Sequence, residues 1–444
     1  MSIKRNFTTE IGVPIVSTQL QDSTCDNARF SIDKCCTTEE IKKVVRQILS
    51  NHKDLLPASK KALIFLKPNL NSDMCGLTGN TTDLRILSAV MTFFKEQGYT
   101  NIVVGDGTSS GFINAGINVI SRLKIDRLAH EFEYKAFDLN KAESMTFKLD
   151  NETDIEIAKV CFDAELFINL PKIKTHAEAG ISACLKNMIG CAVGLQKQKI
   201  HRNLPENIVR LNDIIKPDIH IVDGVMAMEG TGPSRGKPVK MGIIVSGRNP
   251  WLIDSVCSRL MSFSPAEVPY LRLSRRNNAN NSDIKNIEWP VNTAGISRKF
   301  ERPEASLASL INSPVYRKFF VKLRYQRLLF RFFSLDLISK FLYLIKARQD
   351  LFMKQDSNIS SISFNKSKCT GCHLCLDYCP MGFMSYEEIG KNEKCLNCLY
   401  CHFVCSKSAI QIDGSLGYLT YQMTNYAKLI QDQLSSQSLS DDKR

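Results

Sequence analysis

Eight cysteines near the C-terminal end constrain this chain more than any other feature. They form two runs of equal spacing, Cys369-x2-Cys372-x2-Cys375-x3-Cys379 and Cys395-x2-Cys398-x2-Cys401-x3-Cys405. A 4Fe-4S cluster takes three thiolates from such a loop and a fourth from a distant position, and in a doubled run the fourth ligates the other cluster. We therefore expect two clusters, one on Cys369, Cys372, Cys375 and Cys405 and one on Cys395, Cys398, Cys401 and Cys379.

Zinc ribbons and a disulfide framework are the alternative interpretations of these cysteines. Paired zinc ligands do not require a third cysteine at the next x2 position, and disulfide frameworks are typical of small secreted chains. The chain has 444 residues and 16 cysteines, and its first residues lack the apolar core of a secretory signal. We expect a reducing, cytoplasmic location.

Two details of the runs depart from a perfect repeat. Pro380 follows Cys379, but Ser406 stands at the equivalent position after Cys405. That proline shapes a turn and provides no ligand, so we expect ligation to be retained and the second loop to be arranged differently. His373 and His402 occupy spacer positions, where we expect them to set local polarity, because all eight thiols are present.

Composition limits the class of protein. The hydrophobic share of 43% and charged share of 23% are those of a soluble globular protein of two or three domains. No uninterrupted apolar run of about 18 residues exists, so we expect no membrane-spanning helix. The formal charge of +13 is compatible with nucleic acid, an anionic membrane or an acidic partner.

Much of the positive charge lies in one stretch, residues 315–349. It holds nine Lys or Arg residues against one acid, Asp336, interleaved with aromatic residues at helical spacing. One interpretation is a helical bridge between domains. Another is a basic amphipathic helix over 313–349 that touches an anionic membrane peripherally. No nucleic-acid partner is expected, because no recognised motif accompanies the charge.

Strand and helix patterns alternate along the first 300 residues. Buried strands are expected at 62–66, 102–104, 166–170, 219–222 and 241–245. Helices are expected after the Thr37 capping box, from Thr82 to Gly98, near 177–190 and at 250–261. This alternation predicts an α/β fold with an open, mostly parallel sheet, plus a small α+β ferredoxin-like cluster domain. The expected segments are a lead-in (1–37), the α/β domain (38–300), a basic connector (301–358), the cluster domain (359–416) and a tail (417–444) that is polar and mobile from residue 430.

Charged and glycine-rich residues follow four of the expected strands, and ligands of open parallel sheets bind outside the carboxyl ends of the strands. The cationic side chains predict an anionic ligand. The expected catalytic residues are His176, Lys174 and Asp106. The expected binding residues are Lys67, Asn69, Lys172, Lys186, Asn187, Asp223, Gly230, Gly232 and Arg235. A structural histidine, a solvated helix surface around Lys186 and a flexible turn at 230–236 remain open alternatives.

Several short motifs together resemble one family. They are Lys67-Pro-Asn69, Gly105-Asp106-Gly107, Asn169-x-Pro171-Lys-x-Lys-Thr-His176, Leu185-Lys-Asn-x-x-Gly190, Asp223-Gly224 and Gly230-x-Gly-Pro-x-x-Gly236. Over about residues 60–262 the chain resembles domain of unknown function family 362, whose members often carry a C-terminal bacterial ferredoxin-type domain with two 4Fe-4S clusters. The resemblance implies these domains and site residues but no settled substrate.

Taken together, these features predict an iron–sulfur oxidoreductase that passes electrons from two clusters to an anionic small molecule, with a redox partner protein or low-potential donor. Two other classes stay open. One is an electron carrier or assembly protein whose α/β part binds a partner. The other is a non-redox enzyme in which the clusters are structural or sensory.

Overall fold

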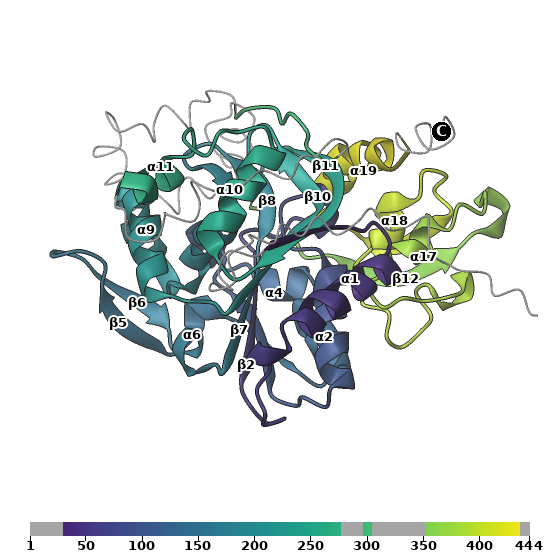
Figure 1. Cartoon of the computed structure of the whole chain (residues 1–444). Coiled ribbons are helices and arrows are strands. Elements are labelled where there is room, and N and C mark those ends of the chain that lie inside the picture. The colour runs from purple at the N-terminus through teal and green to yellow at the C-terminus, as the bar shows by residue number, and fades with distance from the viewer. Residues whose placement is uncertain (1–29, 277–295, 304–351, 436–444) are drawn as a thin grey trace, which may run out of the picture.

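The structure is a computed structural model that describes residues 30–276, 296–303 and 352–435. The expected basic connector lies largely outside these ranges, as does the proposed membrane-contacting stretch at 313–349. Figure 1 shows an α/β body with a smaller cysteine-rich part beside it.

Nine strands of the described chain form one twisted sheet, in the order β1-β11-β10-β7-β2-β3-β4, with β8 paired to β10 and β9 paired to β8. Neighbours from β10 to β4 are parallel, while β11 runs antiparallel to both β10 and β1. The bounds are β1 Phe30–Lys34, β2 Ile64–Pro68, β3 Ile102–Asp106, β4 Lys135–Asp138, β7 Leu166–Leu170, β8 Lys172–His176, β9 Gly180–Ser182, β10 Ile219–Glu229 and β11 Lys237–Gly247. The predicted mostly parallel α/β fold is therefore confirmed.

Alternate residues of each strand face two separate cores, as the period of a buried strand requires. In β2, Ile64 and Leu66 join one core, whereas Phe65 joins the other. Helices α1 (Thr38–Asn51), α2 (Leu84–Glu96) and α5 (Ile125–Glu131) cover the first face. Helices α9 (Leu204–Ile214) and α10 (Pro250–Leu260) cover the second. The sheet is thus enclosed by helices on both sides (Figure 1).

Further short elements lie at the edges of this body. A separate two-stranded sheet is formed by β5 and β6. The remaining bounds are α3 Ser110–Ala115, α4 Val119–Arg122, β5 Ser144–Lys148, β6 Asp154–Ala158, α6 Val160–Asp163, α7 Cys184–Asn187, α8 Lys197–Ile200 and α11 Pro269–Arg276.

The start of α2 differs from the prediction. Thr37 caps α1 with the expected capping box, but α2 is capped by Asp83 and not by Thr82. The Thr82 hydroxyl is engaged elsewhere, because it donates to the carbonyl of Leu170 and accepts from the N–H of Asn69. Thr82 therefore fastens the end of β2 to the end of β7.

The predicted helix at 177–190 is only partly correct. Residues 172–176 and 180–182 are the antiparallel strands β8 and β9, and helix begins only at Cys184. The N–H groups of Cys184 and Leu185 bond to the carboxylate of Asp254 on α10, at 2.7 and 3.2 Å. This tertiary cap sets the start of α7, and periodicity along the chain could not reveal it.

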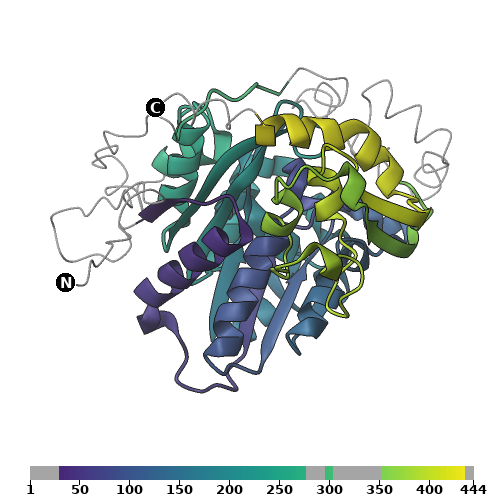
Figure 2. The ribbon, with the colours of Figure 1, turned by 90° about the vertical axis from the view of Figure 1, so that its right-hand side faces the viewer.

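The cysteines lie in a small module with two antiparallel strands, β12 (Asn358–Phe364) and β13 (Ile410–Ser415), and two short helices, α17 (Leu374–Asp377) and α18 (Tyr400–Val404). Its buried residues share one core with α1 and α2. Figure 2 shows the module on the side of the body that carries these helices.

The expected tail contains a further helix, α19 (Leu419–Ser435). The prediction of a mobile tail from residue 430 is therefore wrong for residues 430–435. Ile430 and Leu434 are buried, and Gln431 donates to the carbonyl of Phe403 in α18. Figure 2 shows α19 lying across the module and the edge of the sheet. Its apolar residues are sparse among polar ones, so composition alone did not predict this helix.

Candidate functional site

The two cysteine loops have matching backbones. Gly371 and Asn397 precede the second cysteine of each run and have φ of 74° and 53°, and His373 and Leu399, which follow it, have φ of 59° and 63°. After the fourth cysteine the match continues. Gly382 donates to the carbonyl of Cys379, and Ser408 donates to that of Cys405. The turn after Cys405 therefore keeps the form of the first turn although Ser406 replaces proline, and the expected difference between the loops is not found.

The thiols of the first expected set are neighbours. Burial, and after it the nearby thiols of Cys405, Cys372 and Cys369, raise the pKa of Cys375 to about 12. These three are the partners that the doubled spacing predicts, including the one from the other run.

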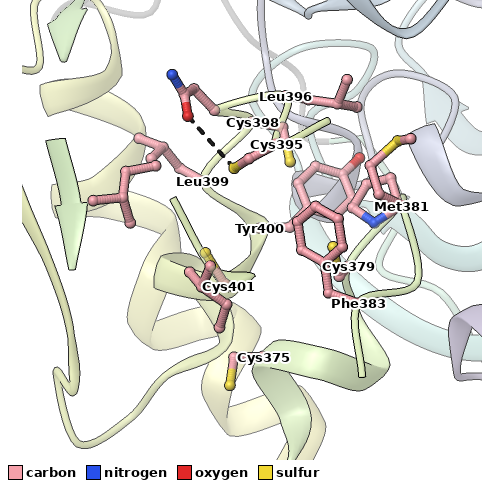
Figure 3. A pocket seen from close by; sticks show the side chains of 14 residues that line it. Cys375, Cys379, Met381, Phe383, Cys395, Leu396, Cys398, Leu399, Tyr400 and Cys401 are labelled. Carbon is pink, nitrogen blue, oxygen red and sulfur yellow. Dashed lines mark hydrogen bonds between the residues drawn. The ribbon is translucent and has the colours of Figure 1, made fainter. Parts of the chain in front are cut away.

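The second expected set gathers in the same way. Burial raises the pKa of Cys398 well above its ordinary value, and Cys379, Cys401 and Cys395 add to the effect. All four cysteines, with Cys375, line one cavity between the loops (Figure 3). Apolar side chains such as Leu396 and Phe383 form its other walls.

These donor sets fit 4Fe-4S clusters better than single ions. No group of three or more His, Cys, Asp or Glu side chains in the described chain is arranged to hold one metal ion. A cubane places its thiolates around four irons, so they need not converge on a common point. The spacer histidines have other partners, because the Nδ1 atoms of His373 and His402 contact the Tyr386 hydroxyl and the Ile410 carbonyl.

At the carboxyl ends of the strands, two of the predicted lysines are enclosed in ion pairs. Lys67 contacts Asp106 and Lys172 contacts Asp223, each with an N–O distance of 2.7 Å. Both lysine side chains are 0% exposed. Their ammonium groups thus face carboxylates inside the protein, and the two pairs hold strand ends together instead of presenting free charge to a ligand.

Lys174 is held differently, by the loop between β2 and α2 (residues 69–83, the β2–α2 loop). Its ammonium donates to the side-chain oxygens of Asn69 and Asn71 and to the carbonyl of Asn80, at 3.0, 2.6 and 2.6 Å. The same loop receives Lys172, which donates to the carbonyl of Gly76 at 3.2 Å. This loop organises two of the predicted cations, but only Asn69 of its residues was expected at the site.

A chain of side-chain amides extends from Lys174 into the sheet. Asn69 donates to Asn187, Asn187 to Asn169, and Asn169 contacts Nδ1 of His220, at 2.9, 2.7 and 2.9 Å. Burial lowers the pKa of His220 to about 3, so this imidazole is neutral. Each amide is oriented by the next, which fixes the oxygen of Asn69 toward Lys174.

Beside this network His176 is buried, and Glu178, Lys186 and His201 near it are partly exposed. Nδ1 of His176 accepts from the N–H groups of Glu178 and Ala179, at 3.1 and 3.2 Å. Burial, and then Lys186, lower the pKa of His176 well below its ordinary value. The ring is therefore neutral with its proton on Nε2. Burial also lowers the pKa of Lys186 to about 8, while Glu178 opposes this effect.

The glycine-rich turn between β10 and β11 lies against β8. The Thr175 hydroxyl donates to the carbonyl of Gly230, and a Cβ at Gly232 would come within 2.0 Å of the Thr175 carbonyl. Glycine at 232 permits this close approach. Gly230 and Gly232 thus act on the position of β8, and Arg235 at the end of the turn is partly exposed.

The structure brings Lys67, Asn69, Asp106, Lys172, Lys174, Asn187 and Asp223 into one hydrogen-bonded region. Beside it lie the buried His176 and the partly exposed Lys186. Sequence reasoning missed Asn71, Asn169, His220, Glu178 and Tyr400. Asn169 stood in the motif that suggested the family, but the other four have no spacing or periodicity that would mark them.

Tyr400 joins this region to the cysteine module. It lies between Cys398 and Cys401 in the sequence, and its hydroxyl accepts from the N–H of Leu84, at 3.2 Å. A Cβ at Gly76 would be 2.6 Å from the same hydroxyl oxygen. The second cysteine run therefore packs directly on the β2–α2 loop.

Comparison with known proteins agrees with this arrangement. Residues 64–259 match the family model for a domain of unknown function (DUF362), and residues 362–385 match the 4Fe-4S binding domain. The chain thus contains one segment that matches each of these two models. The resemblance inferred from the DUF362 motifs is thereby confirmed, and the match to the 4Fe-4S binding domain contains the whole first cysteine run, Cys369 to Cys379.

Two individual proteins are also similar. The chain is 27% identical over 230 residues to thylakoid-associated protein sll1697 of Synechocystis sp.. The alignment covers 48% of this chain and 67% of that protein. The structure of the lactate racemase apoprotein from Thermoanaerobacterium thermosaccharolyticum aligns with a TM-score of 0.36 and 14% identity. That alignment covers 52% of this chain and 57% of the other, so this chain spans less than two thirds of it. Among the described residues, no helix has the length and apolar character needed to cross a membrane.

Proposed function

We propose that this iron–sulfur protein is an oxidoreductase that passes electrons from two 4Fe-4S clusters to an anionic ligand bound beside Lys174, His176 and Lys186. The 4Fe-4S binding domain supports the iron–sulfur part of the proposal. The observation that carries the redox part is the contact between the second cysteine run and the β2–α2 loop, because that loop also holds the ammonium groups of Lys172 and Lys174.

The separation between the two regions is small. Gly76 touches the Tyr400 hydroxyl on one side, and its carbonyl accepts from Lys172 on the other. One glycine therefore stands between the second cysteine run and the Lys172–Asp223 pair. Electron tunnelling weakens steeply with distance, so direct packing of this kind favours transfer between the module and the DUF362 domain.

The side chains divide into two roles. Lys174 and Lys186 would bind the anionic group, and the Nε2–H of neutral His176 would donate the proton that accompanies reduction. Asp106 and Asp223 would hold Lys67 and Lys172, so that these four residues position the strand ends. The clusters, when bound, supply single electrons.

A pair of variants tests the proposal. Protein prepared without oxygen would be examined for co-purifying small molecules by mass spectrometry, and the ligand found would then be added to reduced protein. Lys174→Ala should lose most of the bound ligand, whereas Lys141→Ala, an exposed lysine elsewhere on the domain, should keep it.

Cys398→Ser should bind the ligand but fail to reduce it. Wild-type reduction of the ligand by Cys398→Ser would contradict electron delivery from the second cluster. Zinc in place of iron, or about four irons or fewer per chain, would contradict the two-cluster relay.

A second candidate is a non-redox enzyme with structural clusters, and a specific observation favours it. The guanidinium of Arg85 lies over the ring of Tyr378 in the module, at 4.1 Å, and that of Arg122 lies over Tyr418, just before α19, at 4.3 Å. Both contacts anchor the C-terminal part of the chain to the body. Under this alternative, Cys398→Ser would lower the thermal stability and leave ligand turnover unchanged. An electron carrier or assembly protein would instead bind no small molecule at the strand ends.

We further propose a cytoplasmic protein that contacts anionic membranes peripherally through the basic stretch 313–349. One relative is named as thylakoid-associated, and the stretch combines nine cations with aromatic residues. Flotation with vesicles that contain anionic lipid should be strong at low salt and weak at high salt. Failure to float at low salt would contradict membrane contact.

A further inference from the structure

The two cysteine loops have the same backbone but very different surroundings. Cys372, in the first loop, is exposed, as is His373 after it. At the equivalent positions of the second loop Cys398 is partly buried and Leu399 is 1% exposed, because Leu399 and Tyr400 pack into the core shared with the body. The first loop thus faces solvent, while the second faces the DUF362 domain.

Positive charge borders the solvent-facing loop. Lys366 and Lys368 lie just before Cys369, and Lys407 follows Cys405; all three are exposed. The two segments meet at the end of the β12–β13 ladder, where the N–H of Asn365 donates to the carbonyl of Ala409, at 2.8 Å. We name Lys366, Lys368, Lys407 and the 369–373 loop the basic rim.

Two acidic side chains, Glu387 and Glu388, lie near the basic rim, and one of them is hydrogen-bonded within the module. Glu388 accepts from the N–H groups of Met384 and Ser385 and from the amide of Asn392. Glu387 is exposed and follows Tyr386, whose hydroxyl contacts His373. Among the exposed side chains named here, three lysines stand against one carboxylate, Glu387.

We propose that the basic rim is the docking surface for an acidic single-electron carrier protein. This inference rests on the proposed oxidoreductase function and names its electron donor. Cys369, Cys372, Cys375 and Cys405 would hold the cluster that accepts one electron from the reduced carrier, and the carrier would leave oxidised by one electron. The cysteines beside Tyr400 would hold the cluster nearer the α/β body, which would receive that electron next. Opposite charges raise the association rate of such a pair and orient its redox groups.

The test uses the cluster-loaded full chain and a chemically reduced acidic flavodoxin, mixed anaerobically while cluster absorbance is followed. For the wild type, the second-order rate should fall as salt is raised, because the Debye length shortens. Lys366→Glu/Lys368→Glu/Lys407→Glu should slow the reaction by about 10-fold or more at low salt. The matched control is Lys135→Glu/Lys141→Glu/Lys428→Glu, which makes the same charge change at exposed lysines away from the rim and should stay much closer to the wild type.

Dithionite serves as the check on integrity, because full reduction of both triple variants shows that the clusters are intact. Equal rates for the two triple variants, or a wild-type rate that does not respond to salt, would overturn the docking surface. If the flavodoxin reduces the clusters with the expected charge dependence and the ligand is never reduced, the oxidoreductase proposal fails and the docking surface stands.

Discussion

At the residue scale, the bonding partners of the buried lysines Lys67, Lys172 and Lys174 separate them into two kinds. Lys67 and Lys172 are enclosed with Asp106 and Asp223, and removing one member of such a pair leaves an uncompensated buried charge. Lys174 is surrounded by amide and carbonyl oxygens, and Lys186 is partly exposed. Position in the fold, and not residue type, therefore decides which lysines can meet a ligand.

The lowered pKa of Lys186 leads to a first prediction. With a pKa of about 8, its amine is largely neutral at pH 8.5, whereas an ordinary lysine remains protonated. Limited treatment with an amine-reactive ester at that pH should label Lys186 several-fold faster than the exposed Lys141, as measured by peptide mass spectrometry. If Lys186 were labelled no faster than Lys141 at pH 8.5, and its labelling rose only above about pH 10, the lowered pKa of Lys186 would be contradicted.

Asp254 gives a second prediction. Its carboxylate caps α7, yet burial raises its pKa to about 7. A carboxyl whose pKa is higher in the folded state stabilises most below its unfolded pKa, and this stability is lost as pH rises from about 4 to about 7.

Asp254→Asn should therefore reduce the free energy of unfolding more at pH 5 than at pH 8, by denaturant titration, with a cost of about 1–3 kcal/mol at the lower pH. The exposed Asp213→Asn serves as the control. A cost that is the same at both pH values would show that Asp254 does not titrate between them.

At the scale of elements, the β2–α2 loop and α19 are the parts that join the two domains. Gln422 of α19 is 1% exposed and spans the loop, since it accepts from the N–H of Cys75 and donates to the carbonyl of Asp73, both at 2.8 Å. The loop is thus fastened from outside by a helix that lies almost 350 residues away along the chain.

Replacing Gln422 gives a third prediction. Gln422→Ala leaves two buried backbone groups without partners, so it should lower the free energy of unfolding by about 1–3 kcal/mol. Asn425→Ala, an exposed neighbour on the same helix, should change it by less than about 0.5 kcal/mol. Similar effects in the two variants would mean that α19 does not support the loop.

At the scale of the whole molecule, the doubled spacing predicts which cysteines act together. If the fourth cysteine of each run ligates the other cluster, Cys372→Ser/Cys405→Ser damages one cluster and should retain about four irons per chain. Cys372→Ser/Cys379→Ser damages both and should retain almost none. Iron and sulfide analysis of anaerobic protein gives the counts, and the reverse pattern would mean that each run holds its own cluster.

The sequence by itself determined the features that depend on local spacing. Two cysteine runs predicted the cluster module, alternating apolar segments predicted the parallel sheet, and the motif around Lys172–His176 indicated the DUF362 domain. These succeed because thiolate ligation, strand burial and strand-end loops leave short, regular patterns.

Only the tertiary structure decided which polar residues face each other. The ion pair between Lys172 and Asp223, the tertiary cap on α7 and the packing of Tyr400 against Gly76 each join residues more than 50 positions apart. Sequence periodicity does not reveal such pairs, because each residue fits the local pattern of its own strand, helix or loop. The same long-range packing buries one cysteine loop and exposes its twin, although their backbones are alike.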